Sequence, residues 1–276
     1  MPLACRLFFC RPTHGFERRS SMQPLSIRNV SIGEGSPKII VSLMGKNAAE
    51  AIAQGLAALE AGADCLEWRA DFCENVHDVR SMALDAASLR SAFGDALLLF
   101  TFRSTPQGGQ MELPVPEYAE LTEAMIRTGA FDIVDVESWI GDDQVRALMA
   151  AAHECGVAAI ISHHDFEKTP SVDWMVSEMR RFQDLGADIP KIAVMAHDAS
   201  DTLRLLQATE EMGRVYADGP LITMAMGRYG ALSRLTGEVF GSAMTFCAVE
   251  EASAPGQVDI SLAHSLMEGI HSIHSR

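Results

Sequence analysis

The stretch GVAAIISHH, at residues 156–164, places a glycine before an apolar run and polar side chains at the end of that run. Its Val, Ala and Ile are typical of a strand that a parallel sheet buries on both faces. Glycine favours the left-handed turn that ends a helix and returns the chain to a sheet. Helical patterns flank the stretch, at about 141–154 and about 170–185. The stretch therefore predicts one unit of a repeating strand–helix fold.

The same unit recurs from Lys38 onward, and Gly62, Gly129 and Gly186 likewise precede apolar runs. The expected strands are 38–44, 64–69, 96–103, 131–137, 157–164, 191–195, 221–225 and 242–247; the expected helices are 47–61, 76–92, 115–128, 141–154, 170–185, 199–213, 228–238 and 260–272. Eight such units predict an α/β fold, the (β/α)8 TIM barrel. A doubly wound sheet, the competing fold, would carry a glycine-rich phosphate loop after its first strand, where this chain has Met44-Gly45-Lys46-Asn47.

The N-terminal part of the chain divides into two segments. Residues 24–35 predict a short β-hairpin that closes the lower end of the barrel. Residues 1–21 carry four arginines and one acid without a clear period, and we expect a disordered extension or a stretch upstream of the true start. An arginine-rich targeting leader is the alternative. Residues 22–276 are then one catalytic barrel domain.

Composition and charge exclude several classes of function. The net charge of −15 argues against a nucleic-acid or anionic-membrane partner, because those surfaces need clustered Lys and Arg. It leaves room for a small anionic substrate. The apolar runs are far shorter than the roughly 18 residues of a membrane helix. The six cysteines lack Cys-x-x-Cys and zinc-ligand spacing, which predicts a reduced, cytoplasmic protein.

Alternation along the strands selects the polar side chains that point into the barrel. In 64–69 the apolar Leu66 and Trp68 face the helices, so Glu67 and Arg69 face inward. By the same argument, His163 faces outward and the following residues face inward: Arg103, Asp135, Glu137, His164 and Lys191. Most lie at the carboxyl ends of strands, where barrel enzymes carry their active sites. A self-satisfied ion-pair lattice, such as Glu67 with Arg69 or Arg103, is the alternative, but so many convergent charges favour a site.

Lys191 is the candidate nucleophile among only four lysines. Its apolar strand desolvates the amine and favours the neutral form, which attacks ketones and aldehydes. His164, on the neighbouring strand, is a suitable acid and base. A metal site formed by His163, His164 and Asp165 is disfavoured, because adjacent strand residues point in opposite directions.

The last two strands are followed by candidate carboxylate-binding groups. Arg234 lies after the seventh strand, and a planar guanidinium can bind both oxygens of a carboxylate. The loop after the eighth strand, Glu250 to Gln257, is rich in small residues and has a Pro-Gly pair, which predicts a lid. Ser253 and Gln257 give that lid neutral hydrogen-bonding groups.

These residues resemble those of the type I 3-dehydroquinate dehydratases, which are Schiff-base lyases of the shikimate pathway that leads to chorismate and the aromatic amino acids. The resemblance runs from about Pro37 to about Ile260. It rests on the motifs Pro37-Lys-Ile-Ile-Val-Ser-Leu-Met44, Glu67-Trp-Arg-Ala-Asp71, Phe100-Thr-Phe-Arg103, Ser162-His-His-Asp-Phe166, Pro190-Lys-Ile-Ala-Val-Met195, Ser233-Arg-Leu and Ala252-Ser-Ala-Pro-Gly-Gln257. Together and in order, these motifs are highly specific.

The resemblance implies a role for each candidate. Lys191 forms an imine with the substrate ketone, and His164 moves protons between C2 and the departing C1 hydroxyl. Arg234, Ser253 and Gln257 bind the carboxylate; Glu67, Arg69 and Arg103 hold the ring hydroxyls; Met195 lines the pocket. The resemblance implies no metal or organic cofactor, a small-molecule substrate and a homodimer.

The sequence departs from the family pattern at Gln107, Ala196 and Ala225, and Gln107 is the departure that bears on the site. Two alternative functions also remain. Gln107 stands before Gly108-Gly109 where the family usually has a glutamate, and that carboxylate is expected near the catalytic histidine. Its replacement affects the pKa of His164 and the rate. The alternative functions are another class I Schiff-base barrel lyase, such as an aldolase acting on a sugar phosphate, and a catalytically impaired homologue.

Overall fold

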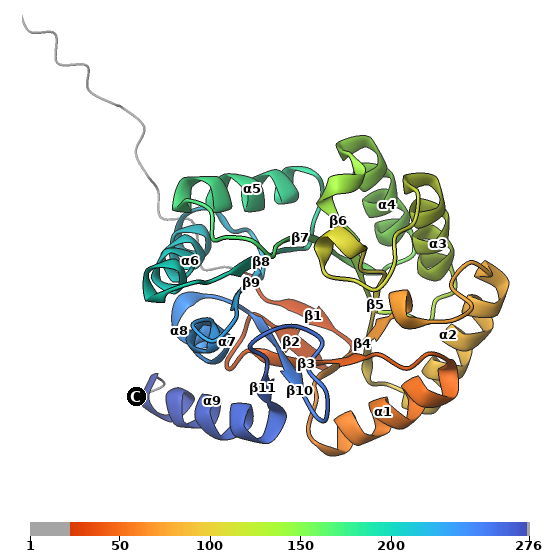
Figure 1. Cartoon of the computed structure of the whole chain (residues 1–276), viewed down its shortest axis with the longest axis horizontal. Helices are drawn as coiled ribbons and strands as arrows, with labels where there is room; N and C mark the ends of the chain where they lie inside the picture. Colours follow the sequence, from red (N-terminus) through yellow and green to blue (C-terminus); the bar gives the residue numbers. More distant parts are fainter. Residues whose placement is uncertain (1–22, 275–276) are drawn as a thin grey trace, which may run out of the picture.

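The computed structural model describes residues 23–274. Eight parallel strands run in the order β10, β3, β4, β5, β6, β7, β8 and β9. Their bounds are β3 Lys38–Leu43, β4 Cys65–Arg69, β5 Leu97–Thr101, β6 Ile133–Glu137, β7 Ala158–Asp165, β8 Ile189–Met195, β9 Ile222–Met226 and β10 Met244–Ala248. These strands form the ring at the centre of Figure 1, and the helices surround it. The predicted (β/α)8 barrel is confirmed.

The ring closes between β9 and β10 through fewer hydrogen bonds than join the other strands. Leu221 and Ser242 form an isolated parallel bridge, in which Ala243 N donates to Leu221 O over 2.8 Å. Thr223 N donates to the Ser242 hydroxyl over 3.0 Å. The two-residue strand β11, Val258–Asp259, pairs with Cys247 and Ala248 farther along β10.

Helices follow the strands as the sequence predicts, with one correction. The long helices are α1 Ala48–Glu60, α2 Val79–Phe93, α3 Val115–Arg127, α4 Asp142–Glu154, α5 Val172–Asp184, α6 Ala199–Glu211 and α9 Ile260–His274; short 3₁₀ or π turns are η1 Ala70–Phe72, η2 Thr105–Gln107, η3 Ser138–Ile140 and η4 Met212–Tyr216. The single helix expected at 228–238 is wrong. Two short helices stand there, α7 Ala231–Leu235 and α8 Gly237–Phe240. A Cβ on Gly237 would lie 2.5 Å from Ser242 O, so only glycine allows the start of α8 to pack this closely against the segment before β10.

Two apolar layers hold the barrel together. The outer layer lies between strands and helices and includes Leu66 and Trp68. The inner layer fills the barrel and includes Cys65, Leu97 and Ile133. Alternate residues of one strand therefore face opposite layers, as the alternation predicted.

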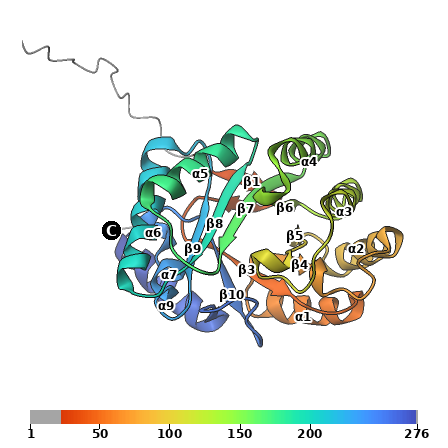
Figure 2. The ribbon, with the colours of Figure 1, turned by 45° about the horizontal axis from the view of Figure 1, so that its top comes forward.

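The predicted hairpin is present at the lower end. Strands β1 Leu25–Ile27 and β2 Val30–Ile32 pair antiparallel, and Ile32 is buried in the inner layer. At the turn, Arg28 binds Asp132 over 2.6 Å and Asp95 over 3.0 Å. Both aspartates precede strands, so the hairpin seals the end opposite the strands' carboxyl ends (Figure 2). The expected extension at residues 1–21 lies outside the described residues.

Candidate active site

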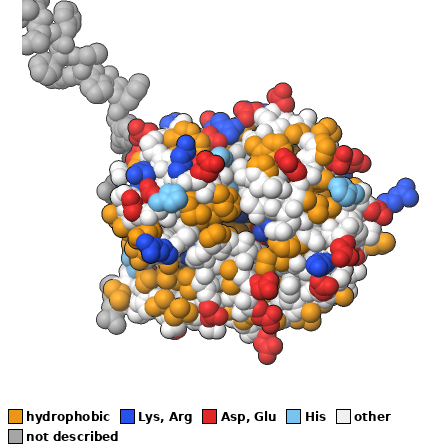
Figure 3. Space-filling view, viewed as in Figure 1, with side chains coloured by type: hydrophobic (Ala, Val, Ile, Leu, Met, Phe, Trp, Pro, Cys, Tyr) orange, Lys and Arg blue, Asp and Glu red, His pale blue; other side chains and the backbone are white. Residues whose placement is uncertain are grey.

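A cavity opens at the carboxyl ends of the strands. Figure 3 looks onto this face and shows basic atoms in a central hollow, while acidic side chains are scattered over the outer part of the face. The cavity brings together eight of the predicted site residues, namely Glu67, Arg69, Arg103, His164, Lys191, Arg234, Ser253 and Gln257. They lie on or directly after β4, β5, β7 and β8, on α7, and on the loop between β10 and β11. The cationic pocket within this acidic protein therefore forms only when the ring closes.

Lys191 lies deep in this cavity and is 2% exposed. Its Nζ lies 2.8 Å from Asp135 Oδ2 and 4.5 Å from the centre of the Phe246 ring. Burial lowers the pKa of the Lys191 amine, and Arg103 lowers it further, while Asp135 opposes the change. The neutral, nucleophilic amine is thus more accessible than on a solvated lysine.

His164 lies on β7 beside Lys191, on the same face of the sheet. Ser162 pairs with Lys191 in the sheet, and His164 is two residues farther along. His163 points the other way and meets the Trp174 ring on α5. The two histidines therefore diverge, as expected for neighbours on a strand.

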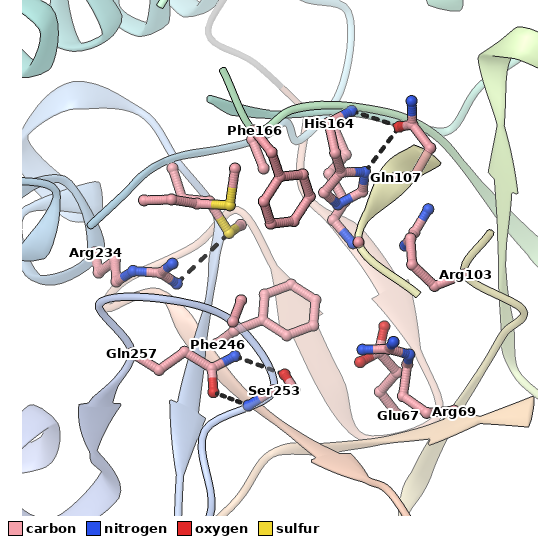
Figure 4. Close-up of a pocket in the computed structure, with 16 residues that line it drawn as sticks. Glu67, Arg69, Arg103, Gln107, His164, Phe166, Arg234, Phe246, Ser253 and Gln257 are labelled. Atoms are coloured by element: carbon pink, nitrogen blue, oxygen red, sulfur yellow. Dashed lines mark hydrogen bonds between the residues drawn. The ribbon is translucent and has the colours of Figure 1, made fainter. Parts of the chain in front are cut away.

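Gln107 determines which nitrogen of His164 carries the proton (Figure 4). The His164 backbone N–H donates to Gln107 Oε1 over 2.6 Å, which identifies that atom as the carbonyl oxygen. His164 Nδ1 lies 3.2 Å from the same oxygen and must therefore carry a hydrogen. Nε2 is left as the unprotonated base of the neutral ring. Burial, Arg103 and Lys191 together hold the pKa of His164 well below its usual value.

Arg234 is a buried cation that no carboxylate neutralises among the described residues. It is 2% exposed, its Nε has no hydrogen-bond partner, and its other contacts are Met224 Sδ at 3.6 Å and Pro255 O at 3.3 Å. Burial lowers the pKa of Arg234 to about 10. A buried charge without a partner is costly, so the site is complementary to an anion entering the cavity.

The loop between β10 and β11 covers the cavity as a lid. Gln257 holds the lid in a turn by accepting from Ser253 N over 2.9 Å and donating to Ser253 Oγ over 2.8 Å. Ser253 Oγ also donates to Ser42 Oγ on β3 over 3.0 Å. On the other side, Gly227 N donates to Pro255 O over 3.2 Å. The lid is therefore attached to both walls of the cavity.

The arrangement joins a desolvated amine, a histidine base and an unneutralised arginine, which suits amine catalysis on a carboxylated carbonyl compound. Comparison with known proteins agrees. Residues 39–274 match the type I 3-dehydroquinase family. The chain is 47% identical to the 3-dehydroquinate dehydratase of Salmonella typhimurium over 250 residues, which cover 91% of this chain and 99% of that protein. This chain belongs to the type I 3-dehydroquinase family.

Solved type I 3-dehydroquinases have the same fold. The enzyme from Clostridium difficile matches with a TM-score of 0.88 and 43% identity, covering 91% of this chain and 99% of that one. The 3-dehydroquinate dehydratase of Geobacillus kaustophilus also gives 0.88, with 38% identity, covering 93% and 99%. As a type I 3-dehydroquinase, this chain is a dehydratase of the hydro-lyase class.

Two carboxylates of this site were not among the predicted site residues. Asp135 binds Lys191. Asp71, which is 0% exposed, accepts two hydrogen bonds from Arg69, of 2.8 and 2.7 Å. Asp135 lies two positions before Glu137 on the inward face of β6, so the alternation contained a signal for it. Asp71 lies in the turn after β4, where alternation no longer applies.

The ion-pair lattice differs from the one considered in the sequence. Arg103 binds Asp135 over 2.8 Å and Glu137 over 2.9 Å, whereas Glu67 accepts from Ser42 and Thr101. Glu67 therefore pairs with hydroxyls and keeps its charge free of a bonded arginine.

Met195 is not among the residues that line the cavity. It packs on the inner layer, with its sulfur beside Gly227. Met224 and Met226, from β9, line the cavity instead. The role expected for Met195 is therefore not supported by its position.

Proposed function

We propose that this chain removes water from 3-dehydroquinate to give 3-dehydroshikimate, through an imine on Lys191 and with His164 as the general base and acid. The observation that carries the proposal is the placement of Lys191, whose buried amine shares one cavity with His164 Nε2 and the unneutralised Arg234. Each group meets one need of the reaction: a nucleophile, a proton carrier and a carboxylate anchor.

The reaction begins when the neutral Lys191 amine adds to the C3 ketone. Its nitrogen forms a bond to carbon. The carbonyl oxygen takes one proton from that nitrogen and one from solvent and leaves as water, and the nitrogen keeps one hydrogen, so the imine is protonated and withdraws electrons from C2. His164 Nε2 then removes a proton from C2. The C2 electrons move toward the imine, and the C1 hydroxyl departs as water with the proton that His164 returns. Hydrolysis of the product imine frees Lys191.

The remaining groups orient the substrate. Arg234 binds its carboxylate, and Ser253 and Gln257 of the lid complete that contact. Glu67, Arg69 and Arg103, all buried or nearly so, hold the ring hydroxyls. The related Clostridium difficile structure is described with covalently modified comenic acid, which supports a nucleophilic residue in that enzyme.

The test is reductive trapping. After incubation with 3-dehydroquinate and borohydride, mass spectrometry should find the adduct on the peptide that contains Lys191. Lys191→Ala should abolish both adduct and turnover. His164→Ala should lose turnover by about 100- to 10,000-fold and still form the adduct. An unmodified Lys191 peptide in the wild type, or near-normal turnover by His164→Ala, contradicts the mechanism.

We also propose that the protein acts in the cytoplasm, in the shikimate pathway, as a homodimer. In the described residues no helix is long and apolar enough to cross a membrane. Support for a dimer comes from the exposed Leu203, Leu232 and Val239 on the neighbouring helices α6, α7 and α8. Sedimentation should show a dimer that Leu232→Glu dissociates, while a wild-type monomer contradicts it.

A further inference from the structure

Asp135 is bound by two cations at one oxygen. Lys191 Nζ and Arg103 Nη2 each lie 2.8 Å from Asp135 Oδ2. The Ser162 hydroxyl donates to the other oxygen, Oδ1. The Asp135 side chain is 0% exposed, so solvent does not screen its charge. These contacts fix the carboxylate, and through it the direction of the Lys191 amine.

We propose that Asp135 is the catalytic counter-ion of the imine: it keeps the imine nitrogen on Lys191 protonated and holds that nitrogen in place through the reaction. The proposal rests on the imine mechanism above. Because Asp135 touches the reacting nitrogen itself, it acts on the chemistry directly and not through another residue.

The charge balance of imine formation explains why a fixed anion suits this position. When a lysine ammonium condenses with a ketone, a C–N bond replaces the C–O bond, and water leaves with the ketone oxygen and two protons from nitrogen. The nitrogen keeps one proton and its positive charge. Asp135 thus faces one N⁺–H group before and after the step and need not move.

Without a nearby anion, burial would lower the pKa of the imine nitrogen, and the nitrogen would lose its proton. Desolvation disfavours a cationic nitrogen, and only the protonated imine withdraws electrons strongly from C2. The other charged or titratable groups that face Lys191 are Arg103, Glu67 and His164. Arg103 repels a cation, and Glu67 accepts hydrogen bonds from the Ser42 and Thr101 hydroxyls on the two strands beside its own. Asp135 is therefore the carboxylate in contact with the nitrogen.

Asp135 itself remains ionised in this setting. Burial alone would raise the pKa of its carboxyl, but Arg103 and Lys191 outweigh burial and hold that pKa below its usual range. Arg103 also divides the carboxylate's attraction, so Lys191 can still lose a proton and act as a nucleophile. Because Asp135 Oδ2 binds both Lys191 and Arg103, it allows the amine to lose a proton and still stabilises the protonated imine.

The test compares wild type with Asp135→Asn in cyanoborohydride trapping, since this reagent reduces protonated imines and spares neutral ones. Each protein is incubated with 3-dehydroquinate across a pH series, and the adduct on Lys191 is measured by mass spectrometry. We expect trapping by Asp135→Asn to fail at a pH about 1–3 units below that of the wild type. Coincident profiles overturn the proposal.

Glu137→Gln is the matched control. Glu137 is also fully buried and binds Arg103, over 2.9 Å, but it does not contact Lys191. This variant should lose turnover through a displaced Arg103 and keep the wild-type trapping profile. An equal shift in both variants would mean a general loss of negative charge and overturns the specific role of Asp135.

A measurement on the wild type covers the case in which Asp135→Asn does not fold. With ¹⁵N-lysine incorporated, the nitrogen shift of the imine formed with 3-dehydroquinate reports whether it carries a proton. A protonated nitrogen above neutral pH is expected, and a neutral one overturns the proposal. Absence of any Lys191 adduct in the wild type refutes the imine mechanism itself, whereas an adduct with unshifted profiles refutes only Asp135.

Discussion

At the scale of single residues, Gln107 shows how an uncharged side chain can orient His164, the proposed general base. Its carbonyl oxygen accepts from both the backbone N–H and Nδ1 of His164, so it selects the tautomer with a free Nε2. A glutamate would select the same tautomer and would also add a negative charge. The amide leaves the low pKa of His164 to burial, Arg103 and Lys191.

Gln107→Glu should therefore raise the pKa of His164. In the wild type the acid limb of kcat/KM should lie below the usual histidine pKa of about 6.5, because His164 remains a neutral base to lower pH. The new carboxylate should move that limb to higher pH by about 1–3 units. Gln107→Leu, which removes the hydrogen-bond acceptor of His164, should lower kcat and leave the acid limb of kcat/KM at its wild-type pH. An unmoved acid limb in Gln107→Glu contradicts this account.

Arg234 should show opposite effects on stability and on substrate binding. Arg234→Met removes a buried cation that has no carboxylate partner within residues 23–274, so the melting temperature of the free protein should rise. KM should increase by about 10- to 100-fold, because a charge-assisted pair with the substrate carboxylate is lost. Calorimetry and steady-state kinetics measure both. A fall in stability would show that Arg234 already has a compensating partner.

At the scale of elements, docking of the lid requires the backbone at Gly256 to lie close to the backbone at Gly227. Gly256 has φ +81°, and a Cβ there would lie 2.5 Å from Gly227 O. The lid can therefore dock against the β9 turn only with glycine at this position. The lid, Ser42 on β3 and Arg234 on α7 meet over one cavity, although they are far apart in the sequence.

Gly256→Ala should impair closure of the lid. Strain at positive φ costs about 1–2 kcal/mol and the clash adds to it, so kcat/KM should fall about tenfold or more. Gly129→Ala is the control, since Gly129 has φ +68° and open space around its Cα. It should lower the free energy of unfolding by about 1–2 kcal/mol and leave kcat/KM unchanged. Equal kinetics for the two variants would exclude the docking contact.

At the scale of the whole molecule, the two ends of the barrel have separate tasks. The hairpin β1–β2 seals one end with Ile32, and the cavity that contains Lys191 and His164 occupies the other. Barrels commonly divide stability and activity in this way. The acidic protein and its cationic cavity follow the same division, since Arg69, Arg103, Lys191 and Arg234 all line the cavity.

Ile32→Ala should therefore lower the free energy of unfolding by about 2–5 kcal/mol, because it leaves a cavity in the inner layer. KM and kcat of the folded variant should stay at wild-type values. Leu84→Ala, at a side chain 71% exposed, is the control and should change stability by less than about 0.5 kcal/mol. Chemical denaturation and kinetics test this, and a raised KM in Ile32→Ala would show that the two ends are coupled.

The sequence by itself determined the strand–helix alternation, the inward direction of Lys191 and His164, and the place of the lid, because side-chain alternation and glycine turns are local properties of the chain. The sequence did not determine which inward side chains bond to one another. Glu67 and Arg69 share a face but bond to hydroxyls and to Asp71, respectively. Asp135 on β6 reaches Lys191 on β8 across the one intervening strand, and Gln107 reaches His164 from a turn 57 residues earlier. Only closure of the barrel decides such contacts, because they depend on distances between segments that the local pattern does not encode.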